Sequence, residues 1–337
     1  MDYPSDSLPR LSPGEPGFET WQLQVNDEER QFGWRIRFTR LYSGDGTSTA
    51  TVEFAYSNRY NPEKENRLLS QNFGEEHFAV KGSANEPFGF RAGDIVLTEE
   101  FSQGILSTFE ETIRWKLEWF NDPDTGRALW PMNALYRWKN PATKLLTPQP
   151  RIRPKGKISI GALDVELEEA FGHVSHWWGT RLPESWHRTY CSGFQETDFA
   201  SLEAITLKTK FGIMPVPGVT LVQLELYGEL FEFTGISHML STASDYSENR
   251  WLIAAENDSH RLQVELQTSE DTLMESVYPV PGDSDRHVRY SGVASMQVTL
   301  SERLDGEWHQ KQKLTCPDAA AFEVGRVTPV ADRSRRR

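Results

Sequence analysis

Cysteine is almost absent from this sequence, since the 337 residues include only Cys191 and Cys316. Two thiols cannot form the disulfide framework that stabilises many small secreted proteins. The opening residues also lack the basic segment and the apolar segment of a secretory signal peptide. We therefore expect a cytoplasmic protein, and a chain of this length buries a sizeable core without disulfides or metals.

Long apolar runs and excess positive charge are missing as well. No apolar run approaches the roughly 20 residues that a membrane-spanning helix requires. The formal net charge is -13 at pH 7, which argues against the basic surface that nucleic acids and anionic membranes require. We expect neither nucleic-acid binding nor membrane insertion, and the sequence gives no indication of the oligomeric state.

Helical periodicity is also scarce, whereas apolar and polar residues alternate along much of the chain. Alternation with a period of two is typical of strands that bury one face. Hairpins are expected around Gly161 and Gly228, and one short helix between residues 131 and 146. Many strands at short spacing predict an all-β protein, a sandwich or a barrel. The clearest alternation lies in residues 34–38, 51–56, 115–120, 158–167, 186–194, 222–233, 262–266 and 296–300.

The ends of the chain and two proline-containing segments suggest how it is organised. Residues 1–17, rich in Pro, Ser and Gly, are expected to form a flexible arm, and residues 327–337 a charged tail. The proline-rich stretch 148–154 is interpreted as a stiff connector. The clearer boundary lies near Pro183, so we predict two β domains, residues 18–183 and 184–326.

The densest group of aromatic and histidine residues lies in residues 172–194. Alternation along its second half places Trp186, Arg188, Tyr190, Ser192 and Phe194 on one face of a strand. His187, on the other face, is expected to be structural. The first face is too aromatic for solvent, and too polar for a dry core in which unpaired groups are costly. It is typical of the wall of a mostly apolar pocket that holds a few orienting donors.

This segment resembles a known family. Residues 172–179, Gly-His-Val-Ser-His-Trp-Trp-Gly, are similar to the Gly-Tyr-x-Asp-His-Asn-Trp-Gly motif of carotenoid 1,2-hydratases and fungal lipocalin-like Diels–Alderases. Leu182, Pro183 and Trp186 that follow resemble tocopherol cyclases. Further similar stretches are residues 18–25, 251–257, 302–304 and 320–325.

The resemblance implies two tandem lipocalin-like β domains with a ligand pocket between them. Members of the family act on long hydrophobic polyenes or prenyl chains by cyclisation, hydration or pericyclic ring closure. No metal or organic cofactor is implied. The expected partner is therefore a hydrophobic small-molecule substrate.

Departures from the family pattern narrow the reaction. The Asp of the motif is Ser175 here and its Asn is Trp177, while the cyclase strand carries Arg188, Tyr190 and Ser192 instead of Trp, Gln and Asn. Hydration of an alkene requires an acid that protonates carbon, and that carboxylic acid is lost. An apolar cage with hydrogen-bond donors remains, which meets the needs of a Diels–Alder-type (4+2) cycloaddition on a linear polyketide polyene in secondary metabolism.

We expect Tyr190, His176 and Arg188 to be the catalytic residues, because each can donate a hydrogen bond to a substrate oxygen. The alternatives are a tyrosine satisfied in the core, a histidine bonded to backbone, and an arginine paired with a structural carboxylate. A second group is expected to bind the substrate, with packing in the core as the alternative. Its members are Trp178, Trp186, Ser192, Phe194 and Trp251.

Two other functions stay open at this point. An acid-dependent hydratase or a tocopherol-type cyclase would act on an isoprenoid and incorporate solvent hydrogen at carbon. A non-catalytic lipocalin-like protein would bind an apolar molecule and release it unchanged. His173 and His176 are three residues apart, but with no cysteine or carboxylate beside them we expect no metal site.

Overall fold

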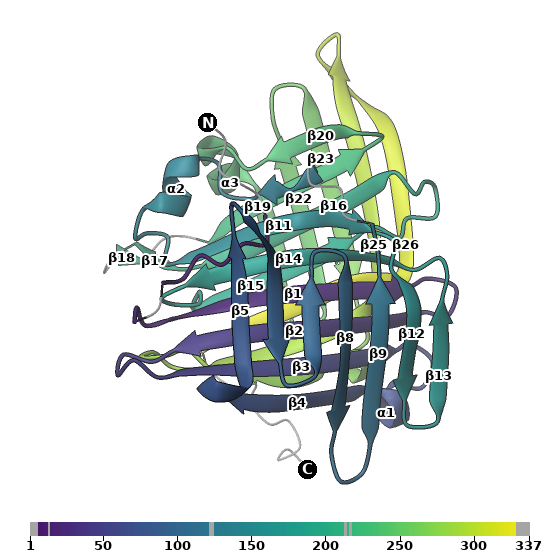
Figure 1. Cartoon of the computed structure of the whole chain (residues 1–337). Coiled ribbons are helices and arrows are strands. Elements are labelled where there is room, and N and C mark those ends of the chain that lie inside the picture. The colour runs from purple at the N-terminus through teal and green to yellow at the C-terminus, as the bar shows by residue number, and fades with distance from the viewer. Residues whose placement is uncertain (1–5, 13, 121–124, 212–213, 216–217, 328–337) are drawn as a thin grey trace, which may run out of the picture.

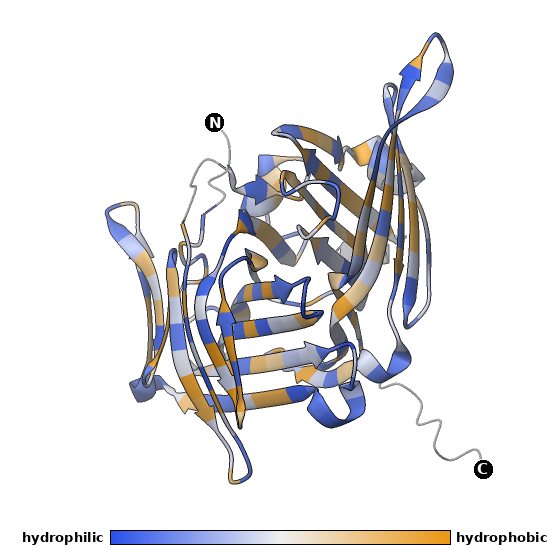
Figure 2. Cartoon of the chain, turned by 90° about the vertical axis from the view of Figure 1, so that its right-hand side faces the viewer, coloured by the Kyte–Doolittle hydropathy of each residue, from blue (hydrophilic) through white to orange (hydrophobic). Residues whose placement is uncertain are grey.

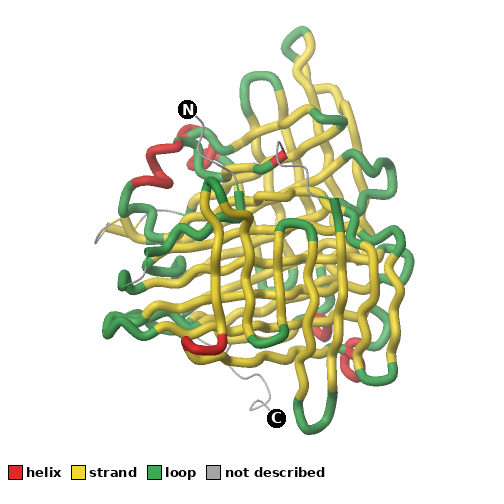
Figure 3. The backbone as a smooth tube through the Cα atoms, in the orientation of Figure 1, coloured by secondary structure: helices red, strands yellow, loops and turns green. Residues whose placement is uncertain are grey.

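The computed structural model describes residues 6–327 except 13, 121–124, 212–213 and 216–217. Strands account for 64% of the described residues and helices for 7%, which confirms the all-β prediction (Figure 3). Across the described ranges, no helix is long and apolar enough to cross a bilayer. The short helices are α1 (Pro62–Glu65), η1 (Glu75–His77), α2 (Asn133–Arg137), α3 (Ile236–Ser241) and η3 (Glu270–Thr272).

The first half of the chain forms two seven-stranded antiparallel sheets, and we call the more deeply buried one sheet A (Figure 1). Its order is β10-β11-β14-β1-β2-β3-β4. Its strands are β1 (Gly17–Asp27), β2 (Phe32–Tyr42), β3 (Ser48–Asn58), β4 (Arg67–Gly74), β10 (Arg127–Ala128), β11 (Thr143–Ile152) and β14 (Phe171–Gly179).

Sheet B packs across one face of sheet A, in the order β13-β12-β9-β8-β7-β6-β5 (Figure 1). Trp21, Trp34 and Phe54 of sheet A and Phe90 and Trp115 of sheet B belong to the core between them. This core buries the apolar half of each alternating strand. The strands of sheet B are β5 (Phe78–Ser83), β6 (Glu86–Ala92), β7 (Ile95–Thr98), β8 (Phe101–Ser107), β9 (Thr112–Glu118), β12 (Lys155–Ile160) and β13 (Leu163–Leu167).

The second half of the chain curls one large sheet, sheet C, around a core of its own. Its order is β20-β19-β16-β15-β26-β25-β23-β22-β21, and β24 pairs with β25. Thr206 of β16 hydrogen-bonds Ser244 of β21 at 2.9 Å, so distant strands of the sheet meet. The long hairpin of β25 and β26 projects from the top of the molecule (Figure 2).

The strands of sheet C have the following bounds. They are β15 (Ser185–Cys191), β16 (Ala200–Lys208), β19 (Val219–Leu226), β20 (Glu229–Phe233), β21 (Ala243–Tyr246), β22 (Arg250–Glu256), β23 (His260–Gln267), β24 (Met274–Tyr278), β25 (Arg286–Leu304) and β26 (Glu307–Arg326). A separate ribbon pairs β17 (Lys210–Phe211) with β18 (Met214–Pro215).

The central strands of sheet A, such as β1 and β14, are buried on both faces, because sheet B covers one face and sheet C the other. Every residue of β1 is buried, including Thr20, Gln22 and Gln24. Alternation is typical of strands that bury one face, whereas β1 is covered on both. The polar face instead lies against sheet C, and we call the contact between these two sheets the junction.

Two glycines allow the backbones to meet at one end of the junction. A Cβ at Gly33 of β2 would overlap the carbonyl oxygen of Gly292 in β25. Asn26 donates to that carbonyl oxygen at 2.6 Å, and Ser57 accepts from the Gly292 amide at 2.8 Å. Absence of side chains at both positions therefore sets the spacing of the two halves.

One sequence-based prediction about the middle of the chain needs correction, and another is confirmed. The proline-rich stretch 148–154 is not a connector, because most of it continues β11 inside sheet A. The pairing of β11 with β14 shifts register between Leu146 and Gln149 and again before Ile152, and such bulges accommodate prolines. The short helix expected between residues 131 and 146 is present as α2, and β11 begins after it at Thr143.

The described part of the predicted N-terminal arm lies against sheet A. The Ser7 carbonyl accepts from the Trp21 indole at 2.8 Å, and the Leu11 carbonyl accepts from Arg40 at 2.9 Å. The predicted C-terminal tail, apart from Val327, lies outside the described residues. The chain crosses from sheet A to sheet C between Gly179 and Ser185, where the domain boundary is predicted.

We expect Gly33→Ala to destabilise the protein, because the new methyl group would overlap the Gly292 carbonyl. Overpacking of this kind lowers the free energy of unfolding by about 1–3 kcal/mol, measurable by urea denaturation. Gly44→Ala is the control, since its nearest neighbour would be a Pro16 carbon at 3.6 Å. Equal stability of the two variants would contradict the close contact between the halves.

Candidate functional site

A network of buried charges occupies the middle of the junction. The Arg35 guanidinium, with no exposed surface, donates to Glu53 of β3 and to Glu323 of β26, each at 2.8 Å. Arg37 also donates to Glu53, at 3.3 Å. The network holds two positive and two negative groups and is therefore electrically balanced. It ties sheet A to sheet C through charge-assisted hydrogen bonds.

Aromatic donors complete the shell around Glu323. The Trp186 indole donates to one carboxylate oxygen at 2.8 Å, and the Tyr278 hydroxyl donates to the other at 2.7 Å. The guanidinium carbon of Arg37 lies 3.6 Å from the centre of the Tyr278 ring. Trp186 packs where β26 has no side chain, at Gly325. These contacts leave Glu323 surrounded by donors.

A second polar group lies farther along β14 and β15. Arg188 donates to Glu203 of β16 at 2.8 Å, and the Thr147 hydroxyl also donates to Glu203. The His173 ring lies on the Tyr190 ring, with 3.5 Å between centroids. Burial raises the pKa of the Tyr190 hydroxyl well above its usual value of 10, so this group is a neutral donor.

Several buried polar atoms in this second group have no hydrogen-bond partner within the described part of the chain. They gather where β14 faces β15, next to the ion pair of Arg188 with Glu203. We call this set the unpaired wall. It consists of both ring nitrogens of His173, the Ser175 hydroxyl, the Trp177 indole nitrogen, Arg188 Nε, the Tyr190 hydroxyl and the Ser192 hydroxyl.

Open space at the junction is divided into a groove and a small void. The groove, of about 490 Å³, lies at the edge between β3, β4, β24 and β25 and is lined by charged residues such as Arg37, Glu53 and Arg289. The void, of about 20 Å³, reaches Gln22 and Trp177 and also touches Arg37. The void has room for about one water molecule. Neither of these two spaces has the size and the apolar lining of the large pocket expected from the sequence.

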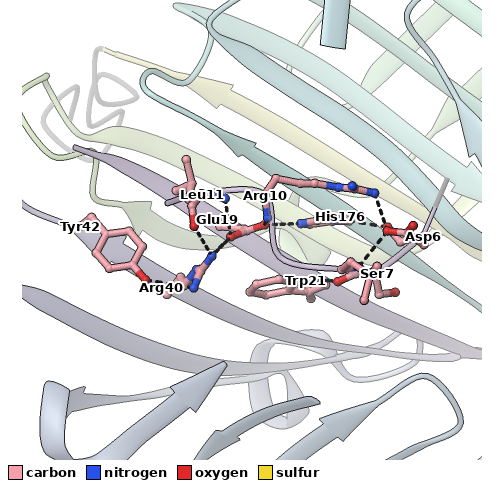
Figure 4. Close-up of polar contacts among 10 residues, drawn as sticks. Asp6, Ser7, Arg10, Leu11, Glu19, Trp21, Arg40, Tyr42 and His176 are labelled. Atoms are coloured by element: carbon pink, nitrogen blue, oxygen red, sulfur yellow. Dashed lines mark hydrogen bonds and ion pairs between the residues drawn. The ribbon is translucent and has the colours of Figure 1, made fainter. Parts of the chain in front are cut away.

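His176 does not join Tyr190 and Arg188, because β14 presents it to the opposite face of sheet A. Its Nε2 lies 2.8 Å from Glu19 Oε1, and its ring stacks on Trp21 at 4.9 Å. Arg40 pairs with the other oxygen of Glu19, and the described part of the N-terminal arm covers the cluster (Figure 4). Although burial opposes it, the His176 and Arg40 contacts hold the pKa of Glu19 below its usual value.

Three of the five predicted substrate-binding residues lie away from the unpaired wall. Trp178 faces the same side as His176, 4.8 Å from its ring. Trp251 lies in the core of sheet C and donates to Ser244 at 2.8 Å. Phe194 belongs to that core as well, because β15 ends at Cys191 and the alternation stops there. The prediction that Phe194 shares the face of Trp186 is therefore wrong.

Trp186 and Ser192, in contrast, do lie at the junction or beside it. Trp186 is 6.1 Å from the Trp177 ring and 6.2 Å from the Tyr278 ring. Ser192 follows β15 and contributes an unpaired hydroxyl to the wall. Arg188 forms an ion pair with Glu203, which is the structural role given above as its alternative. Its Nε nevertheless has no partner in the described structure.

The residue pattern alone does not predict a role for Arg35, Glu53 or Glu323, or the position of His173. Nothing in the spacing of charged residues along β2, β3 and β26 sets them apart from a solvated strand face. His173 carried a usable signal, because it lies two residues from Ser175 and therefore on the same face of β14. It cannot share a metal ion with His176, which faces the other side.

The departures from the family motif follow this division of faces. His173, Ser175 and Trp177 replace the Tyr, Asp and Asn of the motif, and all three face the junction. His176 and Trp178 match the motif and face away from it. The residues that differ are therefore those that a ligand in the junction would contact.

Comparisons with known proteins agree with this fold. The family model described as tocopherol cyclase-like matches residues 63–326. A search of curated proteins gives no significant match. The crystal structure of CghA covers 94% of this chain and 89% of its own at 10% identity, with a TM-score of 0.54. Kievitone hydratase from Nectria haematococca covers 97% and 93% at 9% identity, with a TM-score of 0.53. At these identities the likeness establishes the lipocalin-like fold alone.

We expect Arg35→Met to be strongly destabilising, because it leaves Glu53 and Glu323 buried with less compensation. Breaking one partner of a buried ion pair lowers the free energy of unfolding by about 3–5 kcal/mol. Arg250→Met is the matched control, since Arg250 and Glu265 form a pair that is half exposed and worth at most about 1 kcal/mol. Urea denaturation of both variants measures the difference, and a loss as small as that of the control would show that the network is not the main link.

His187 lies on the face of β15 that points into the core of sheet C. Its burial predicts how the stability of the protein depends on pH. Burial, partly offset by a hydrogen bond to Ser247, lowers the pKa of His187 from 6.5 to about 4. Between these values the unfolded chain binds a proton that the folded chain does not, so stability falls as the pH decreases from 6.5 towards 4. We expect His187→Phe to reduce this pH dependence in urea denaturation, and replacement of the exposed His77 to leave it unchanged.

Proposed function

This chain belongs to the tocopherol cyclase-like family, and we propose that it is a cofactor-independent cyclase that closes a ring on a linear hydrophobic polyene by (4+2) cycloaddition. One observation carries the proposal. The junction positions that differ from the family motif supply hydrogen-bond donors, and the acidic residue of the motif is replaced by Ser175. A polyketide polyene from secondary metabolism is a substrate with the required chemistry.

A cycloaddition needs the two reacting ends of the polyene to be held together, and little else. Confinement of the polyene in one folded conformation lowers the entropic part of the activation barrier. A donor aimed at the dienophile carbonyl adds electrostatic stabilisation. Tyr190 is the proposed donor, since its hydroxyl is neutral and buried, with the Ser192 hydroxyl beside it. Arg188, anchored by Glu203, places a second N–H beside it.

The apolar end of the junction offers surface for the hydrocarbon chain. Phe18, Trp177, Leu182, Trp186 and Tyr278 belong to one buried cluster there. Aromatic faces of this kind favour a folded polyene over an extended one, because they bury more of its apolar surface.

Entry of a substrate requires the void to open. Arg286 joins the segment between β14 and β15 to the segment between β24 and β25. It donates to the backbone carbonyls of Leu182 and Pro183 and to the Asp283 carboxylate. The segment between β24 and β25 also separates the void from the groove, through Pro279. We infer that this segment moves when substrate enters from the groove.

An acid-dependent hydratase or chromanol-forming cyclase is the less favoured alternative. Protonation of an alkene requires a carboxylic acid that keeps its proton. Although burial opposes it, Arg37 and Arg35 hold the pKa of Glu53 below its usual value, so this carboxylate is ionised. Glu323 accepts hydrogen bonds from Arg35, Trp186 and Tyr278, so both of its oxygens are occupied by donors of the protein.

The reaction type is tested with purified protein and a linear polyene that carries a diene and a conjugated carbonyl. We expect ring closure without any added cofactor, and no deuterium at carbon in the product formed in D₂O. Incorporation of deuterium would establish the protonation mechanism instead. A rate no higher than that in buffer would refute the proposal.

We expect Tyr190→Phe to lower the turnover number by roughly 100-fold, the order of loss when one stabilising donor is removed, with substrate affinity little changed. Tyr227→Phe is the control, because Tyr227 is largely exposed. Single-turnover kinetics and fluorescence titration separate the two quantities. A protein that binds the polyene and returns it unchanged would be a carrier, and both variants would then behave alike.

A further inference from the structure

The unpaired wall contains both kinds of hydrogen-bonding group, and their arrangement restricts the ligand. Burial of a donor or acceptor without a partner costs free energy that a protein normally avoids. His173, Ser175, Trp177, Arg188 and Tyr190 all hold such atoms, and all five side chains are at most 5% exposed. Concentration of these atoms along two adjoining strands indicates a binding surface that a ligand satisfies.

Two of these groups can only donate. The indole N–H of Trp177 and the Nε–H of Arg188 have no lone pair to offer. They are neighbours, since the guanidinium carbon of Arg188 lies 4.9 Å from the centre of the Trp177 ring. A ligand that satisfies them must therefore present an acceptor oxygen at this place, such as a carbonyl.

His173 supplies the opposite function. Burial first, and then the charge of Arg188, lower the pKa of His173 well below its usual value of 6.5. The imidazole is therefore neutral at physiological pH, with one nitrogen as donor and the other as acceptor. Because the ring lies 3.5 Å from that of Tyr190, this acceptor is placed beside the donors of the same wall.

The charges that surround the wall are already compensated. Arg188 pairs with Glu203, and Arg127, which also faces Tyr190, pairs with Glu225. An anionic ligand would add an uncompensated charge to a buried region, which is costly. A neutral ligand group avoids that cost.

We propose that His173 is a specificity-determining residue that accepts a hydrogen bond from the substrate, and that the substrate carries a neutral carbonyl joined to an N–H donor. An amide at the end of an apolar chain is the simplest such group. Its oxygen would accept from Arg188 or Trp177, and its N–H would donate to His173. This inference deepens the proposed function, because it names the polar group that the same site would bind.

The test compares three ligands with the same long alkyl chain: a primary amide, its N,N-dimethyl amide and the plain hydrocarbon. Affinities for the full-length protein are measured by isothermal titration calorimetry. We expect the primary amide to bind about tenfold more tightly than the dimethyl amide, because only the former gives His173 a donor. The hydrocarbon should bind more weakly than either amide.

Variants then assign the preference to His173. His173→Phe should abolish the difference between the two amides, whereas His173→Gln should keep part of it, since Gln retains an acceptor. His187→Phe is the matched control, because that histidine lies on the opposite face of β15, and it should keep the full preference. Circular dichroism establishes that each variant is folded.

Equal affinity of wild-type protein for the two amides, or no binding of either, would overturn the proposal, and this comparison needs no variant. A preference that survives in folded His173→Phe would also overturn it. None of these ligands contains a diene, so their binding is independent of ring closure. Failure of the cyclase assay with an intact amide preference would therefore reject the reaction and leave the binding inference standing.

Discussion

The ion pairs of Arg35 with Glu53 and Glu323 are the interaction on which the relation between the two halves of the chain depends. The guanidinium has no exposed surface, and desolvation of so many charges is tolerated only because each carboxylate meets several donors. A sliding or rotation of sheet C over sheet A would separate these partners inside a medium of low polarity. The network therefore selects one arrangement of the halves, and the Gly33 and Gly292 contact fixes their spacing at one end.

The functional hypothesis depends on the fact that the central strands of sheet A are buried on both faces. On an exposed strand face, a hydroxyl or indole nitrogen without a partner in the protein is bonded to water, so it does not indicate a ligand site. In the junction, both carboxylate oxygens of Glu323 are paired, with donors from Arg35, Trp186 and Tyr278. The groups of the unpaired wall, such as His173 and Tyr190, depart from that pattern within the same contact. Because hydrogen bonds are complete around Glu323, the missing hydrogen bonds in the unpaired wall indicate that a ligand binds there.

Much of the fold follows from the sequence, because strand alternation and turn residues act locally. The hairpins around Gly161 and Gly228 are present as β12–β13 and β19–β20. The failures arise where a distant segment changes the environment. Alternation cannot reveal that the polar face of β1 is covered, and the prolines of β11 are tolerated only because its pairing with β14 is bulged. The site was partly predictable, since Arg188 and Tyr190 share a face, whereas the position of His176 depends on which face of β14 meets sheet C.

The two faces of β14 also explain how one fold of this family can carry different chemistry. His176 and Trp178 pack with Trp21 and Glu19 behind the sheet, where any change would disturb the core and the N-terminal arm. Their neighbours along the strand point the other way, so an exchange of Asp for Ser175 alters the junction without repacking that core. Alternation thus separates the residues that maintain the sheet from those that contact a ligand. Position 177 is less free to change, because Trp177 packs on Trp186, and the Trp186 indole is hydrogen-bonded to Glu323. Any change of specificity at that position also acts on the charge network that joins the halves.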